Sequence, residues 1–148
     1  MYHSITFKNK NGTSRNTWTN WHLIPSSRPL VAPPTVVEKF VDIPGRDGPL
    51  DVTTLLTGSP VLGSRKGAWE FYVMHDKWSD WPTAYSTILK FLHGKEMYVI
   101  LEDDPDYQYH GRVKVGGWQS PKDYSTITIE YTLDPNKEGL VEGANFTL

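Results

Sequence analysis

Several stretches of the sequence alternate apolar and polar residues with a period of two, which is the period of a β-strand. The alternation is clearest in two stretches, Lys66 to Met74 and Ile127 to Leu133. In the first of them, Trp69, Phe71 and Val73 share a face. Weaker alternation or a short apolar run predicts further strands at residues 3–7, 16–24, 36–43, 50–56, 97–101 and 107–115. In residues 36–43, the apolar face consists of Val37, Val41 and Ile43.

One stretch has a helical period instead. Ser79 and Asp80 are helix-capping residues, Pro82 suits a first turn, and Gly94 is a typical residue after a helix end. Between these signals, the apolar residues fall on one side of a helix: Trp81, Tyr85, Ile88, Leu89 and Leu92. Strands before and after one helix predict a mainly β fold, an antiparallel β-sandwich or partly closed barrel with one flanking α-helix.

The length bounds the number of domains. A chain of 148 residues is enough for one compact domain and short for two. We expect this domain to occupy residues 1–133. Residues 134–148 contain Gly139 and Gly143 and few apolar anchors, so we expect a C-terminal tail there unless a partner orders it.

A turn rich in glycine and proline separates the apolar runs 36–43 and 50–56. Gly45 and Gly48 can adopt the positive φ angles that a reversal needs, and Pro44 fixes φ on one flank. Arg46 and Asp47 stand at its centre. The turn thus has a fixed shape, although it can equally be a polar hairpin tip whose ion pair contributes under about 1 kcal/mol.

Composition excludes several classes of protein. The chain has no cysteine, which removes disulfides and thiolate chemistry, and its formal net charge of -2 gives no excess of cations for a nucleic-acid backbone. Neither an export signal at the N-terminus nor an apolar run of membrane-spanning length is present. We therefore expect a soluble protein with no membrane partner and no specific binding of DNA.

Motifs for catalysis, cofactors or metals are not apparent, and we expect no enzyme, no catalytic residues, no metal and no cofactor. Asp103, Asp104 and Asp106 lie close together, but the spacing of a calcium loop is missing, so a solvated hairpin turn is the simpler interpretation. The five histidines are scattered. Glycosidase carboxylates could be assembled from several glutamates, yet nothing in the sequence favours any pair: Glu70, Glu102 and Glu130.

Two tryptophan pairs allow a different kind of site. Aromatic rings stack on sugars, so Trp18 with Trp21, and Trp78 with Trp81, are candidate sugar platforms. Packing in a core or an interface is the more frequent use of tryptophan. A cell-wall carbohydrate-binding module is therefore an alternative, and not the first hypothesis.

An ordered set of motifs resembles the distal tail protein family of long-tailed phages and prophages. The set is Ile43-Pro44-Gly45-Arg46-Asp47-Gly48 with Leu50-Asp51, then Arg65 before Trp69-Glu70-Phe71, then Phe91-Leu92-His93-Gly94, then Tyr109-His110-Gly111-Arg112-Val113. The opening, from Asn16-Thr17-Trp18 to Pro25-Ser26-Ser27-Arg28-Pro29, is similar to the form found in prophages of Gram-positive bacteria. The resemblance covers roughly residues 4–133.

The resemblance implies a non-catalytic hub at the tip of the virion tail, assembled in the cytoplasm of the host bacterium. In that family, a tail-tube-like domain forms a hexameric ring that joins the tail tube protein to tail-tip, tail-associated or baseplate proteins around a channel for DNA. A tail tube protein of the same fold remains an alternative. Longer members carry a second, often carbohydrate-binding domain after the sandwich, whereas only residues 134–148 follow it in this sequence, so we expect the ring-forming role to carry over.

A closed ring requires rigid contacts between different patches on neighbouring copies. The proline-bounded and glycine-containing turn supplies rigidity, and we expect residues 29–51 to lie at the boundary between subunits. The candidate interface residues are Pro44, Gly45, Arg46, Asp47, Gly48 and Arg65. Arg46 and Asp47 are expected to pair across or beside the contact, with Arg65 nearby.

Overall fold

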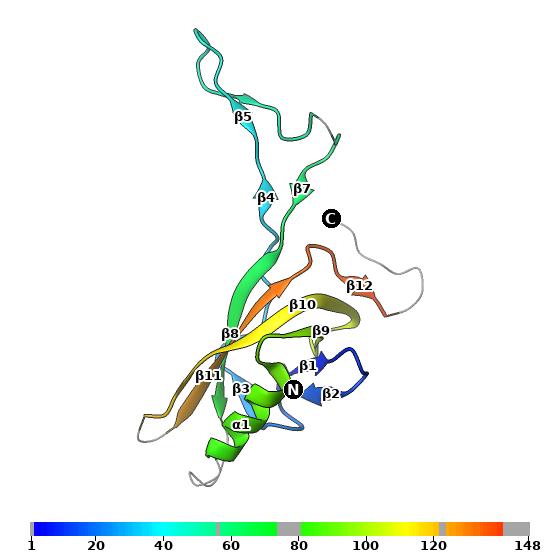
Figure 1. The fold of residues 1–148 in the computed structure, drawn as a ribbon, viewed down its shortest axis with the longest axis vertical. Coiled ribbons are helices and arrows are strands. Elements are labelled where there is room, and N and C mark those ends of the chain that lie inside the picture. The colour runs from blue at the N-terminus through cyan, green and yellow to red at the C-terminus, as the bar shows by residue number, and fades with distance from the viewer. Residues whose placement is uncertain (1, 56, 74–80, 122–123, 141–148) are drawn as a thin grey trace.

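The protein is seen here as a computed structural model that describes residues 2–55, 57–73, 81–121 and 124–140. Most of its strands form one antiparallel sheet, curled into a half-barrel that we call the body (Figure 1). The order across the sheet is β2-β1-β9-β10-β11-β8-β3, and β12 pairs with β10. The bounds are β1 Ile5–Lys8, β2 Ser14–Asn16, β3 Leu23–Pro25, β8 Arg65–Val73, β9 Lys95–Leu101, β10 Asp104–Gln119, β11 Ser125–Leu133 and β12 Glu138–Gly139.

The alternation read from the sequence places one face of this sheet in the core. Ile127 lies opposite Phe71, and Ile129 lies opposite Trp69, so apolar side chains from β8 and β11 meet on the same side. All four are buried. The mainly β fold and the partly closed barrel are confirmed, whereas the described residues give no second sheet that would make the body a sandwich.

The predicted helix is also confirmed. Helix α1, Trp81–Leu92, buries Ile88 and Leu92 against the core, and Gly94 follows it with a φ of +72°. The expected capping residues, 79 and 80, lie outside the described residues. No helix among the described residues is long and apolar enough to span a membrane.

The strand expected over residues 16–24 is wrong for residues 17–22, which form turns between β2 and β3. The side-chain Oδ1 of Asn16 accepts hydrogen bonds from the backbone N–H groups of Trp18 and Thr19. Asn20 in turn accepts the N–H of Asn16 through its own Oδ1. These local bonds compete with a strand ladder, which is the usual effect of asparagine.

The chain leaves the body between β3 and β8 to make a long projection, residues 33–64, which we call the arm (Figure 1). The arm contains four two-residue strands, namely β4 Val36–Val37, β5 Phe40–Val41, β6 Leu50–Asp51 and β7 Val61–Leu62. Strand β4 pairs with β7, and β5 pairs with β6. The strands expected at 36–43 and 50–56 are therefore interrupted, and residue 56 lies outside the described residues.

Residues 134–140 return to the body, where we expected a free tail. The backbone N–H of Asp134 donates to the carbonyl of His110, and the N–H of Leu140 donates to the carbonyl of Asp106. Between them, β12 pairs with β10. The boundary predicted at residue 133 stays a prediction, and residues 141–148 lie outside the described part of the chain.

Candidate assembly surface: the arm and its root

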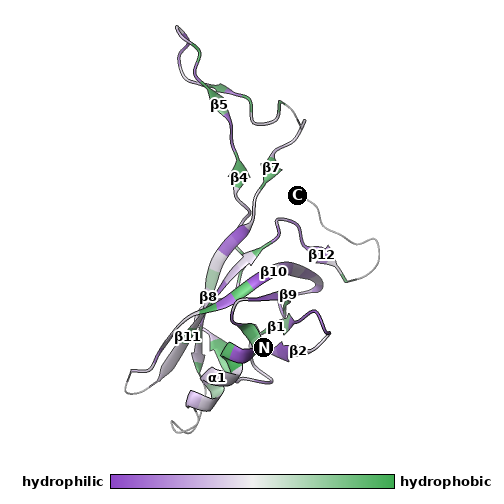
Figure 2. Cartoon of the chain, in the orientation of Figure 1, coloured by the Kyte–Doolittle hydropathy of each residue, from purple (hydrophilic) through white to green (hydrophobic). Residues whose placement is uncertain are grey.

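The arm concentrates exposed apolar side chains. Of the thirteen large hydrophobic residues that are exposed in the described chain, eight lie in the arm. They are Val36, Val37, Phe40, Val41, Ile43, Leu50, Leu55 and Val61. Strands β4, β5 and β7 accordingly appear as hydrophobic segments that stand away from the body (Figure 2). Exposed apolar side chains gathered in this way are typical of surfaces that contact another molecule.

The arm has no core of its own. Among the described residues, no core side chain lies between positions 33 and 64. The expected shared face of Val37, Val41 and Ile43 faces solvent, since a two-stranded ribbon has no second layer to cover it. The alternation in the sequence thus identifies an apolar face, but the arm itself does not bury that face.

The tip of the arm is the glycine- and proline-containing turn. Gly45 and Gly48 have φ angles of +81° and +75°, as the sequence led us to expect. The backbone N–H of Arg46 donates to the carbonyl of Ile43 at 3.1 Å. Arg46 and Asp47 are exposed, and no salt bridge between described residues includes either. Their pairing across a contact remains a prediction.

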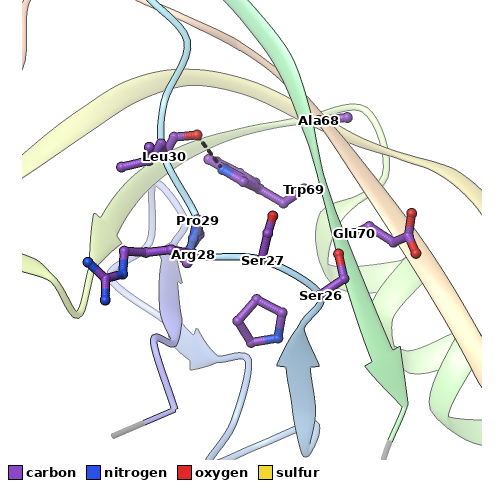
Figure 3. A pocket seen from close by; sticks show the side chains of 9 residues that line it. Ser26, Ser27, Arg28, Pro29, Leu30, Ala68, Trp69 and Glu70 are labelled. Carbon is purple, nitrogen blue, oxygen red and sulfur yellow. Dashed lines mark hydrogen bonds between the residues drawn. The ribbon is translucent and has the colours of Figure 1, made fainter.

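Side chains of the body fix the arm where it leaves the sheet. The indole Nε1 of Trp69 donates to the carbonyl of Leu30 at 3.0 Å (Figure 3). The backbone N–H of Ala32 donates to the hydroxyl of Tyr131 at 2.7 Å, and the guanidinium of Arg65 donates to the carbonyl of Ala32 at 3.2 Å. Residues 30–32 and these three side chains form what we call the root.

Arg65 belongs to the root, since it is the first residue of β8, and the arm extends from there to the turn at residues 44–48 (Figure 1). Its residue is only 8% exposed, and its Nε also donates to the carbonyl of Pro135 at 3.0 Å. The guanidinium lies over the ring of Tyr109 at 5.4 Å. Arg65 lies four residues before Trp69, so the alternation along β8 places both on the inward face. This spacing was the signal in the sequence that Arg65 is buried.

A pocket of about 400 Å³ lies beside the root, between residues 25–30 and β8. It is lined by Pro25, Ser26, Ser27, Arg28, Pro29, Leu30, Ala68, Trp69 and Glu70. In Figure 3, Arg28 points away from it. The lining supplies two serine hydroxyls and one carboxylate with no histidine, so the arrangement that activates a serine nucleophile is not assembled there.

Both tryptophans of the first candidate pair pack against other aromatic side chains. Trp21 is 6% exposed and packs with Phe7 and Phe91, which leaves no open ring face. Trp18 stacks on Tyr2 with their ring centroids 3.8 Å apart. Residue 78 and the side chain of residue 81 lie outside the described part of the chain.

A charged cluster attaches residues 134–140 to the body. The Nε2 of His110 lies 2.5 Å from Glu96, and its Nδ1 lies 3.1 Å from Asp134. Partial burial acts to lower the pKa of His110, but the hydrogen bonds to Asp134 and Glu96 raise it overall. Hydrogen bonds from Lys10 and then His110 lower the pKa of Glu96. The cluster therefore favours a protonated His110.

Comparison with known proteins supports the fold. No protein-family model and no curated protein matches the chain. The crystal structure of SPP1 Dit (gp 19.1), described as a paradigm of the hub adsorption apparatus in phages that infect Gram-positive bacteria, has a similar fold, with a TM-score of 0.63 and 18% identity. The match covers 91% of this chain and 52% of that chain, so this chain spans about half its length. The distal tail protein fold expected from the sequence is thus confirmed.

Proposed function

We propose that this chain is a structural protein of a phage tail tip and that copies of it join through their arms into a closed ring. The observation on which this rests is the arm, which exposes eight large apolar side chains and has no core of its own. The fold shared with SPP1 Dit, itself described as part of a hub adsorption apparatus, supports the tail location. The proposed role involves no catalysis.

The geometry of the arm favours contact between unlike patches. The arm projects along the longest axis of the molecule, away from its own body (Figure 1). A copy that inserts its arm into a neighbour leaves its own body free to receive another arm, and such head-to-tail contacts produce rings when the rotation closes. The turn at the tip and the bonds at the root limit the ordering cost of the contact.

The finer parts of the proposal come from the resemblance to distal tail proteins. The ring has six copies and connects the tail tube protein to tail-tip or tail-associated proteins. DNA passes through its channel without specific binding. The protein acts at the tail tip of the virion after assembly in the cytoplasm of the host bacterium.

The test compares two double variants that each replace two exposed apolar side chains. Phe40→Ser with Val41→Ser changes the arm, and Tyr72→Ser with Tyr124→Ser changes the body. Light scattering after size-exclusion chromatography should show rings for the body variant and monomers for the arm variant. Rings in both samples would contradict the role of the arm, and a monomeric parent protein would contradict the proposed function.

Two further measurements test the details. Negative-stain images should show isolated rings, whereas long tubes would identify a tail tube protein instead. Arg46→Ala with Asp47→Ala should reduce ring formation, and unchanged rings would reject the pairing proposed for these two residues.

A further inference from the structure

Two adjoining hollows on the body meet where α1 ends and β9 begins. Their volumes are about 380 and 360 Å³, and both are lined by Gly94 and Arg112. Because they share these residues, we treat them as one surface and call it the basic groove. Its charged residues are Lys10, Lys95, Glu96, Arg112, Lys114 and Glu130.

The charged side chains that line the basic groove are four cations and two carboxylates, so the lining has an excess of positive charge. Its two carboxylates are already paired, Glu96 with Lys10 at 2.8 Å and Glu130 with Lys114 at 3.5 Å. Between described residues, no salt bridge includes Lys95 or Arg112. Their cationic groups donate to backbone carbonyls instead, and that of Arg112 lies 2.9 Å from the oxygen of Gly94.

The arm has an excess of negative charge. It contains four carboxylates, Glu38, Asp42, Asp47 and Asp51, against the two cations Lys39 and Arg46. The carboxylate of Asp51 already accepts a hydrogen bond from the backbone N–H of Thr53 within the arm.

At the tip of the arm, Asp42 and Asp47 are exposed, and no salt bridge between described residues includes either. Ile43, next to Asp42, is 42% exposed. The tip, residues 42–48, thus presents two carboxylates and one cation, Arg46, beside an apolar side chain. On one side of the basic groove, the aliphatic part of the exposed Lys114 side chain offers apolar contact beside the cations.

We propose that the arm tip of one copy, residues 42–48, docks in the basic groove of a neighbouring copy. Asp42 and Asp47 lie close to Lys95 and Arg112 in this contact, and Ile43 lies against the aliphatic part of Lys114. A chain cannot make the contact with itself, because its own arm points away from its body (Figure 1). The inference rests on the proposed ring and adds the surface that receives the arm.

Charge reversal tests the contact. Asp42→Lys with Asp47→Lys, and separately Lys95→Glu with Arg112→Glu, place like charges together and should each weaken ring formation by roughly tenfold or more. The chain with all four changes restores opposite charges, so it should recover rings. The matched control is Lys8→Glu with Lys66→Glu, which reverses two exposed lysines outside the groove. Mass photometry across a dilution series measures the ring fraction.

The outcomes separate this inference from the proposed function. If the parent protein forms rings and the groove variant forms them equally well, the arm docks elsewhere and the inference is overturned while the ring stands. The inference also fails if the fourfold variant does not recover. If the parent protein forms no rings at all, both proposals fall.

Site-directed crosslinking gives a second measure, since the chain has no native cysteine. Ile43→Cys combined with Lys114→Cys should form disulfides between copies on mild oxidation and give a ladder of covalent oligomers. Ile43→Cys combined with Glu70→Cys, an exposed position on β8, should remain monomeric on denaturing gels. Equal ladders from the two pairs would overturn the inference.

Discussion

The body and the arm use similar residues in different surroundings. Phe71 in β8 and Phe40 in β5 both belong to antiparallel strands, yet Phe71 is fully buried and Phe40 is 52% exposed. The body covers its inward face with α1 and with the curl of its own sheet. The arm is a two-stranded ribbon, so its apolar residues can be covered only by another molecule.

This difference shows what an alternating apolar pattern can predict. It indicates which side chains need to be buried, but it does not indicate which surface buries them. In the body, folding meets that need. In the arm, we propose that assembly meets it. Stability of the monomer and the ability to assemble should therefore respond to different residues.

The largest effect should come from equivalent phenylalanine truncations. Phe71→Ala leaves a cavity in the core and should lower the free energy of unfolding by about 3–5 kcal/mol. Phe40→Ala removes an exposed ring and should change it by less than about 0.5 kcal/mol. Urea denaturation of monomeric protein measures both, and a similar loss in the two variants would mean that the arm packs on its own body.

An intermediate effect is expected at the root. Arg65→Ala leaves the carbonyls of Ala32 and Pro135 without their buried donor, which should cost about 2 kcal/mol of unfolding free energy. Hydrogen exchange should also increase at residues 30–32. Arg28→Ala, which removes an exposed arginine, is the control. Unchanged exchange at the root would show that Arg65 does not fix the arm to the body.

The smallest effect is a dependence on pH confined to the body. Because the pKa of His110 is raised above its ordinary 6.5, its stabilising contribution is complete below about pH 6.5 and is lost as pH rises through the raised value. The lowered pKa of Glu96 has the opposite effect at acidic pH. Urea denaturation at several pH values should show this alkaline loss of stability.

His110→Gln provides the matched variant for this measurement, because glutamine cannot gain the positive charge. The variant should lose the alkaline dependence. The hydrogen-exchange protection of the arm, corrected for the intrinsic effect of pH on exchange, should not change over the same alkaline range in either protein. A pH dependence that persists in the variant would assign it to another group.

The sequence predicted the elements in which periodicity and tertiary packing agree. β8, β11 and α1 were found because each has a regular apolar face, and that face lies in the core. The turn between β1 and β2 also has a signal in the sequence, since Asn11 is followed by Gly12, which has a φ of +87°.

The misses arise where side chains or distant strands decide the local structure. Asn16 and Asn20 form side-chain bonds that turn residues 17–22, and no periodicity reports such bonds. Strand β12 forms because it meets β10, although its two residues have no apolar pattern. The arm was predicted as two strands, but their projection from the body could not be predicted, since alternation does not specify the covering surface.

For the candidate site, the sequence predicted the turn and the positive φ angles of its glycines, while the expectation that Arg65 lies near the contact between copies stays a prediction. A charged residue is rare on the inward face of a strand. Arg65 occupies such a position and is buried at the root. The basic groove was missed entirely, because its cations come from separate segments that only the fold brings together: Lys10, Lys95, Arg112 and Lys114.

The bonds at the root have a mechanical consequence. The arm behaves as a lever with its pivot at residues 30–32, so any angular error there grows in proportion to distance along the arm. Trp69, Tyr131 and Arg65 hold that pivot from three different strand positions. The position of the tip relative to a neighbouring copy is therefore determined at the root, by residues that do not contact that copy.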